Sequence, residues 1–80
     1  MSTMHDLKCW PEYFVPLYNG KKNFEVRVND RNYKVLDTLL LKEWDPATGK
    51  YTGRESLKVI IYILQGQCGL PKDLCVMQLR

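Results

Sequence analysis

The sequence predicts a small, mainly β domain with some α+β character, made of about five short strands and one early, short helix. Three observations lead to this expectation. The chain has 80 residues, which suffices for one core, so we treat residues 1–80 as a single domain. Apolar residues alternate with polar ones, or form short runs, over segments of strand length. Turn residues separate these segments, and only one stretch shows helical spacing.

The first two expected elements are a strand and a helix. Residues 5–9 alternate, which places Leu7 and Cys9 on the core side. Residues 10–20 follow with a proline at the first helical position and an Asn-Gly pair that commonly ends a helix. Because Pro16 removes one backbone hydrogen bond, we expect this helix to be kinked or partly 3₁₀. Its predicted inner face consists of Tyr13, Phe14 and Leu17.

Four more strands complete the predicted sheet. They cover about residues 23–29, 38–44 and 51–64, with a last strand at 74–79. The turn at residues 45–50, DPATGK, makes the second and third of these antiparallel. The later half of the third is apolar on both faces, so it should be central. Unpaired edges are a liability in so small a sheet, and closure into a small barrel would remove them.

Charge is concentrated in the segment around residues 20–31, GKKNFEVRVNDR. The chain has 12 basic and 9 acidic residues, a net charge of +3. Residues 20–34 contain five basic and two acidic residues, so this segment carries the whole excess. A local positive patch of this kind suits an anionic partner.

The strand within this segment has two different faces. We expect Glu25 and Arg27 to point away from the core, with Lys22 at the strand entry, as a compact cluster able to hold an anion or a base edge. The alternative is a solvated sheet face whose charges form weak cross-strand pairs. The residues expected to point into the core are Phe24, Val26 and Val28.

Several classes of protein are disfavoured by composition. Cys9, Cys68 and Cys75 are odd in number and contain no CxxC pair, so we expect reduced thiols rather than a disulfide framework. His5 is the only histidine, and neither a metal nor a cofactor is expected. No apolar run approaches the ~18–20 residues that span a bilayer. The N-terminus lacks the features of a signal peptide, so we expect a cytoplasmic protein with no membrane partner.

A family resemblance adds to this reading. Gly20, Lys22, Glu25 and Arg27 match the pattern G-x-K-x-x-E-x-R, the signature of ASCH domains. The flanking HDLK before a proline, the NDR after the strand and the Y…D before the next strand also match. Over roughly residues 5–64 the chain resembles the DUF3850 family, in the ASCH branch of the PUA-like superfamily. The resemblance implies a small PUA-like pseudo-barrel.

The resemblance also implies a cleft that takes RNA, a nucleoside or a nucleotide. Lys22, Glu25 and Arg27 would line it, with Lys8 and Arg31 at its margin. Protein partners, the oligomeric state and the ligand's identity stay open, and a module that binds an acidic protein is supported by charge alone. The candidate aromatic side chains for stacking are Trp10, Tyr33 and Trp44.

An enzymatic reading is the main alternative. Related ASCH proteins hydrolyse N4-acetylcytidine with a Lys, Thr, Glu set, which would make this chain a small amidohydrolase acting on a modified nucleoside. The lysine matches Lys22, but Glu25 stands where the threonine is expected, and Glu43 is the candidate for the third member. If the chain is an enzyme, Lys22 and Glu25 are the candidate catalytic pair. We favour binding over this specific hydrolysis.

Two positions depart from the family pattern. Leu36 stands where the family usually has glycine before Asp37, so that turn has to form without a residue that adopts positive φ easily. Pro16 is unusual within the helix. Both departures concern local geometry rather than the fold.

Overall fold

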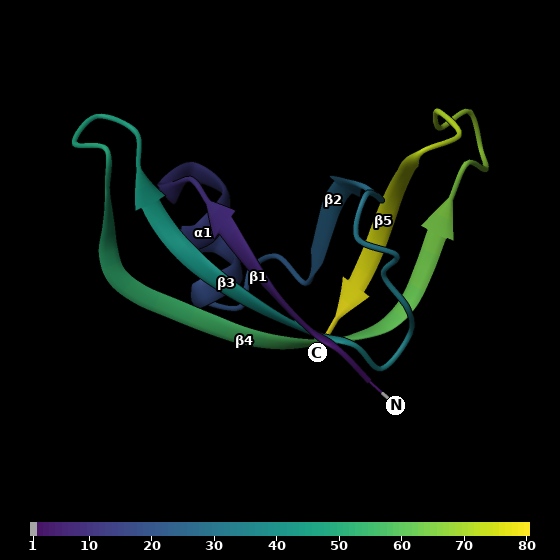
Figure 1. Cartoon of the computed structure of the whole chain (residues 1–80), viewed down its shortest axis with the longest axis horizontal. Helices are drawn as coiled ribbons and strands as arrows, with labels where there is room; N and C mark the ends of the chain where they lie inside the picture. The colour runs from purple at the N-terminus through teal and green to yellow at the C-terminus, as the bar shows by residue number, and fades with distance from the viewer. Residues whose placement is uncertain (1) are drawn as a thin grey trace.

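The computed structural model of the chain describes residues 2–80 and shows a five-stranded mixed sheet with one helix (Figure 1). The mainly β class and the predicted order of elements are confirmed, and every expected strand end lies within one residue of the observed one. The elements are β1 (Met4–Cys9), α1 (Pro11–Tyr18), β2 (Phe24–Val28), β3 (Thr38–Asp45), β4 (Lys50–Gln65) and β5 (Leu74–Leu79).

The strands lie in the order β1-β3-β4-β5-β2, so β4 is central as predicted. β1 runs parallel to β3, whereas the other neighbours are antiparallel. β4 is long enough to pair with β3 through its first part and with β5 through its second. Figure 1 shows β4 curving upward at both ends, which curls the sheet. β1 and β2 are therefore its two edges, and no strand pairing joins them within the described residues.

The helix α1 packs on the β3–β4 part of the sheet through a narrow face. Phe14 and Leu17 are fully buried, whereas Tyr13, which we expected in the core, is 54% exposed. Two helical turns can bury only one stripe, and the i, i+3 pair occupies it. α1 runs as one α-helix through Pro16, whose missing N–H removes a single hydrogen bond. This eight-residue helix is the only one in residues 2–80, and it is too short to cross a membrane.

The two faces of β2 are the reverse of the prediction. Glu25 is 4% exposed and Arg27 is half-buried, so these charged side chains point toward the core side. The alternation itself is as predicted, but the apolar set lies outside. Its members, between 45% and 56% exposed, are Phe24, Val26 and Val28.

Pairing with β5 explains this reversal. Glu25 lies opposite Met77, which is buried in the core, and directly opposite residues share a face of the sheet. On the other face, Val26 lies opposite Val76, which lies opposite Leu64 of β4. The apolar side chains of β2 therefore continue an apolar stripe across the outer face of three strands.

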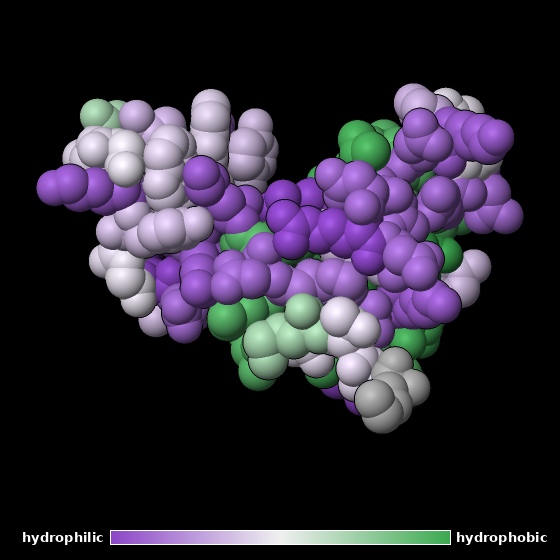
Figure 2. Space-filling view, in the orientation of Figure 1, coloured by the Kyte–Doolittle hydropathy of each residue, from purple (hydrophilic) through white to green (hydrophobic). Residues whose placement is uncertain are grey.

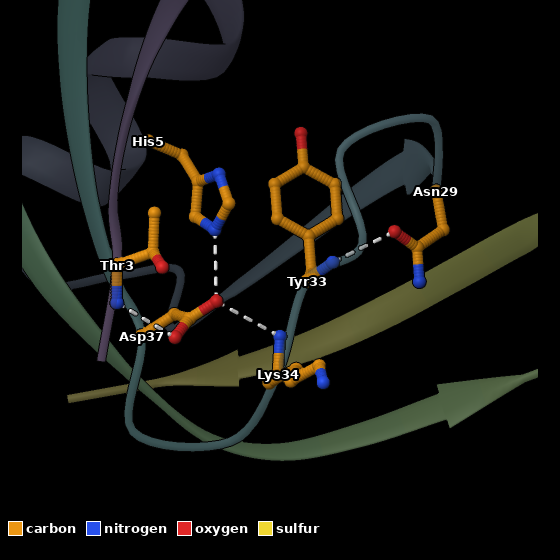
Figure 3. A network of polar contacts seen from close by, with 6 residues as sticks. All are labelled: Thr3, His5, Asn29, Tyr33, Lys34 and Asp37. Carbon is orange, nitrogen blue, oxygen red and sulfur yellow. Dashed lines mark hydrogen bonds and ion pairs between the residues drawn. The ribbon is translucent and has the colours of Figure 1, made fainter. Parts of the chain in front are cut away.

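A buried polar network fastens the loop between β2 and β3 to β1 (Figure 3). Asp37 accepts hydrogen bonds from the backbone N–H of Thr3 (3.0 Å) and of Lys34 (3.1 Å) and lies 2.8 Å from Nε2 of His5. Burial acts to raise the pKa of Asp37, but the hydrogen bonds from His5 and the two amides outweigh it and lower the pKa. The ionised carboxylate thus holds the loop in place.

The turn that precedes β3 adopts the conformation for which glycine was expected. Leu36 has φ +78° and a side chain that is 65% exposed. Its N–H donates to the carbonyl of Ile60 at 2.7 Å, while Ile60 donates to the carbonyl of Asp37 at 2.9 Å. These bonds to β4 hold a leucine in the left-handed region, which L-residues other than Asn and Asp rarely occupy.

Candidate binding pocket

A concave pocket of about 640 Å³ lies between the β1–α1 corner and β2. This volume falls in the range of roughly 300–1,000 Å³ that is typical of small-molecule sites. Figure 2 shows the surface hollowed between the α1 side and the β5 side, with hydrophilic residues gathered across the middle. The first wall consists of Lys8, Cys9, Trp10 and Tyr13. The second wall consists of Lys22, Phe24, Glu25, Val26 and Arg27.

Three residues singled out from the sequence come together in this pocket. Nε of Arg27 donates to Oε2 of Glu25 at 2.8 Å, and Nζ of Lys22 lies 3.9 Å from Oε1 of the same carboxylate. The Glu25 side chain is only 5% exposed, whereas those of Lys22 and Arg27 are 20% and 27% exposed. Two cations therefore share one buried carboxylate, which leaves the cluster with net positive charge on its open side.

Two arginines also bridge the edges of the sheet. Nη2 of Arg27 donates to the carbonyl of Lys8 at 2.8 Å, and Nη1 of Arg31 donates to the carbonyl of Asp6 at 3.1 Å. Both carbonyls lie on β1, the edge opposite β2 in strand order. Side chains rather than strand pairing thus connect the two edges. Arg31 serves this bridge and does not line the pocket.

The turn after α1 positions Lys22. Gly20 has φ +85°, which lets the chain reverse direction at the helix end. The N–H of Lys22 then donates to the carbonyl of Pro16 at 2.9 Å, which ties this residue to the helix. Its ammonium lies 5.6 Å from the ring centroid of Tyr13 and 5.5 Å from that of Phe24, within cation–π distance of both.

The aromatic lining differs from the expectation. Trp10 lines the pocket and is 45% exposed, as a stacking residue would be. Tyr33 is buried and does not line the pocket. Trp44 does not line it either, but its ring centroid lies 4.3 Å from the ammonium of Lys8, a residue of the pocket wall. Sequence reasoning missed Tyr13, although its spacing of three residues from Trp10 places both on one side of a helix start.

Cys9 lines the pocket, but its thiol is unreactive. It is 2% exposed, and burial together with the charge of Glu25 raises its pKa to about 11, against the opposing effect of Arg27 and Lys22. The neutral thiol therefore dominates at neutral pH, as expected for a reduced, unreactive cysteine. Throughout residues 2–80, no three His, Cys, Asp or Glu side chains are grouped to hold a metal.

Glu43, the guessed third member of a hydrolytic set, is committed elsewhere. It is 2% exposed and accepts hydrogen bonds from Nε and Nη2 of Arg54, both at 2.8 Å, and from the hydroxyl of Thr52 at 2.6 Å. Hydrogen bonding from Arg54 lowers the pKa of Glu43 despite its burial. The Arg54 guanidinium also lies 5.3 Å from the ring of Tyr18. This cluster fastens α1 to the β3–β4 hairpin, and Glu43 does not line the pocket.

The chain matches, over residues 4–79, the family described as "Domain of unknown function (DUF3850)". The chain belongs to this family. Among curated proteins, the DUF3850 chain is 44% identical over 55 residues to the "Uncharacterized 12.9 kDa protein in GpA 3'region" of Escherichia phage P2. That match covers 69% of this chain and 49% of the phage protein, so the chain spans about half the length of this relative. Neither description states an activity for the DUF3850 chain or for the phage protein.

Proposed function

We propose that this DUF3850 domain is a binding module of the ASCH, PUA-like type whose pocket holds single-stranded RNA or a nucleotide. One observation carries the proposal: Lys22, Glu25 and Arg27 line the same concave pocket as the exposed rings of Trp10 and Tyr13. Cationic groups suit phosphate, and exposed rings suit the stacking of a base, which is how single-stranded nucleic acids are usually held.

Each side chain has a distinct part in the proposal. Within residues 2–80, the ion pair of the Lys22 ammonium is the 3.9 Å contact with Glu25, so the ammonium retains donors for a phosphate oxygen. Arg27 uses Nε and Nη2 for Glu25 and β1, and within residues 2–80 its Nη1 has no hydrogen-bond partner. Glu25 fixes the orientation of Arg27. Trp10 and Tyr13 stand 45% and 54% exposed on the other wall, where a base would stack.

Hydrolysis of a modified nucleoside is the alternative. It would require a water-activating group beside Lys22, where Glu25 stands in place of threonine. Glu43 lies outside the pocket lining, and Cys9 is a buried thiol of high pKa. No observation favours this chemistry over binding, so binding is the function that we propose.

The test is a titration with a fluorescently labelled single-stranded RNA at several salt concentrations. Lys22→Gln and Lys21→Gln form a matched pair: each removes one positive charge, but Lys21 is exposed and outside the pocket lining. Lys22→Gln should weaken binding by roughly 10-fold or more, as expected for loss of a charge-assisted hydrogen bond. It should also reduce the dependence of log K on log salt by about 0.7. Lys21→Gln should stay near wild type at physiological salt.

Two outcomes would contradict the proposal. Equal weakening by both lysine variants would indicate diffuse attraction rather than a site. Absence of binding to RNA and to the free nucleotides would refute the function itself. Incubation with N4-acetylcytidine decides the alternative, because release of cytidine that stops in Lys22→Gln would establish hydrolysis.

A further inference from the structure

Side chains from both faces of β2 line the pocket, which places the pocket along the free edge of that strand. Phe24 and Val26 point to one face of the sheet, and Glu25 and Arg27 point to the other, yet all four line the pocket. The only places adjacent to both faces of a strand are its two edges. β5 occupies one edge of β2, and Figure 1 shows the other edge facing β1 and α1. The pocket lies along this second edge, because Lys8, Cys9 and Tyr13 form its opposite wall.

Hydrogen bonds at the two ends of β2 establish which backbone groups face this edge. The N–H of Asn29 donates to the carbonyl of Asp73, and the N–H of Leu79 donates to the carbonyl of Asn23, both at 2.8 Å. In an antiparallel pair, residues alternate between bonding to the partner strand and pointing away from it. The odd-numbered residues of β2 therefore bond to β5, and the even-numbered residues direct their N–H and C=O to the free edge.

Two residues supply this open edge within the pocket. The carbonyl of Val28 is taken by the N–H of Asp30 at 2.9 Å, and Val28 does not line the pocket. Phe24 and Val26 do line it, and none of the turn and loop hydrogen bonds within residues 2–80 uses their N–H or C=O. Each thus offers one donor and one acceptor to whatever enters.

The length of this edge favours a planar ring over a peptide. Strand addition needs several successive open residues on an edge. Here Asp30 closes one end, and the N–H of Lys22, bonded to Pro16, begins a turn at the other. A single extended residue, such as Val26, presents its N–H and C=O side by side, as a nucleobase presents a neighbouring acceptor and donor.

We infer that the backbone of β2, chiefly the N–H and C=O of Val26, reads the hydrogen-bonding edge of a nucleobase in the pocket. This rests on the proposed function and names the part of the ligand that the site recognises. The N–H donates to a ring nitrogen or carbonyl of the base, and the C=O accepts from the neighbouring N–H. Trp10 and Tyr13 stack on the ring, and Lys22 meets the phosphate. A base methylated at its donor is rejected, because the carbonyl then loses its partner.

Amide hydrogen exchange measured by NMR tests the inference on the native protein. Without ligand, the amides of Phe24 and Val26 should exchange faster than those of Glu25 and Arg27, which bond to β5. Saturating UMP, CMP or AMP should slow exchange at Val26 by roughly 10-fold or more. The amide of Val28 is the internal control, because it faces the same edge outside the pocket.

Two further measurements remove one hydrogen-bond donor each, first from the ligand and then from the protein. N3-methyl-UMP lacks the ring donor of UMP and should bind roughly 10-fold more weakly. Val26→Pro removes the backbone donor at a position where an edge strand tolerates proline, and it should weaken nucleotide binding by roughly two- to tenfold. Val28→Pro makes the same change outside the pocket and should leave binding within twofold of wild type.

The possible results separate the two levels of the proposal. Nucleotide binding that depends on Lys22 but neither protects the Val26 amide nor discriminates against N3-methyl-UMP overturns the inference and leaves the proposed function standing. Absence of any nucleotide or RNA binding overturns both. Protection of Val26 by a short extended peptide of alternating Glu and Val, and by no nucleotide, would assign the edge to peptide binding and overturn the inference.

Discussion

Leu36 offers a direct test of the loop geometry before β3. It is an exposed leucine with φ +78°. The left-handed conformation costs an L-residue about 1–2 kcal/mol, and glycine avoids this cost because it has no Cβ. Substitution by alanine retains the strain, whereas substitution by glycine removes it. The comparison between these two variants isolates the backbone conformation from the loss of the leucine side chain.

The expected magnitudes follow from exposure and strain. Leu36 is 65% exposed, so about a third of its side-chain burial is lost in Leu36→Ala, roughly 0.5–1 kcal/mol. Leu36→Gly then recovers about 1–2 kcal/mol of strain. The greater freedom of glycine in the unfolded chain offsets roughly 0.5–1 kcal/mol of this gain. Leu36→Gly should therefore be more stable than Leu36→Ala by about 0.5–1 kcal/mol and close to wild type.

The neighbouring Val35 provides the matched control. It is 49% exposed in the same turn but is not among the residues of positive φ. Val35→Gly should be less stable than Val35→Ala by roughly 0.5–1 kcal/mol, the ordinary penalty of glycine. The sign of the Gly–Ala difference should thus reverse between adjacent residues. Urea unfolding followed by tryptophan fluorescence measures it, with equal m-values as the check that the denatured states are comparable.

The prediction is refuted if the difference in stability between the glycine and alanine variants has the same sign at position 35 and at position 36. If Leu36→Gly is less stable than Leu36→Ala, the backbone at position 36 is not left-handed in solution. Thermal unfolding provides a second measurement, since 1 kcal/mol shifts the Tm of a domain this size by about 4–8 °C.

Two further predictions concern titratable groups. Exposed Cys68 should react with an aromatic disulfide reagent at pH 8 well before Cys9 and Cys75, because burial raises the pKa of the thiols of Cys9 and Cys75. A second thiol that reacts as fast as Cys68 would contradict the burial of Cys9 and Cys75. Asp37→Asn should destabilise the protein by about 1–3 kcal/mol at pH 7. Since the folded pKa of Asp37 lies below its ordinary 3.8, this difference should shrink as the pH falls below that value. Asp30→Asn, an exposed change in the same loop, should alter the stability little at pH 7.

The elements of this fold could be predicted because their signals are local. The short apolar run within residues 38–44, the turn that follows and the apolar run that returns each specify a strand or turn from nearby residues alone. The turn at Leu36 was also indicated by its place in the sequence. The resemblance marked its position as one for glycine, and the observed φ of +78° shows that the turn keeps that geometry with a leucine in place.

The inward face of β2 could not be predicted, because alternation defines two sets of side chains without saying which is buried. The decision comes from β5, which aligns Glu25 with Met77, 52 residues further along the chain. Burial of a carboxylate normally argues against an inward position. Here Arg27 and Lys22 both contact the buried carboxylate of Glu25, and Arg27 also donates a hydrogen bond to the carbonyl of Lys8 on β1. The open backbone of Val26 was missed for the same reason, since strand order determines which edge is free.

Arg27 and Lys22 therefore differ in what their removal can reveal. Arg27 connects β2 to Glu25 and to β1, so its loss would leave a buried carboxylate short of a partner and loosen the bridge between the sheet edges. Weaker binding in such a variant would not distinguish a lost contact from a distorted pocket. The Lys22 ammonium lies 3.9 Å from the Glu25 carboxylate and over the rings of Tyr13 and Phe24, and it does not bridge to β1 as Arg27 does. A loss of binding in Lys22→Gln, with stability unchanged, would therefore report on the ligand itself.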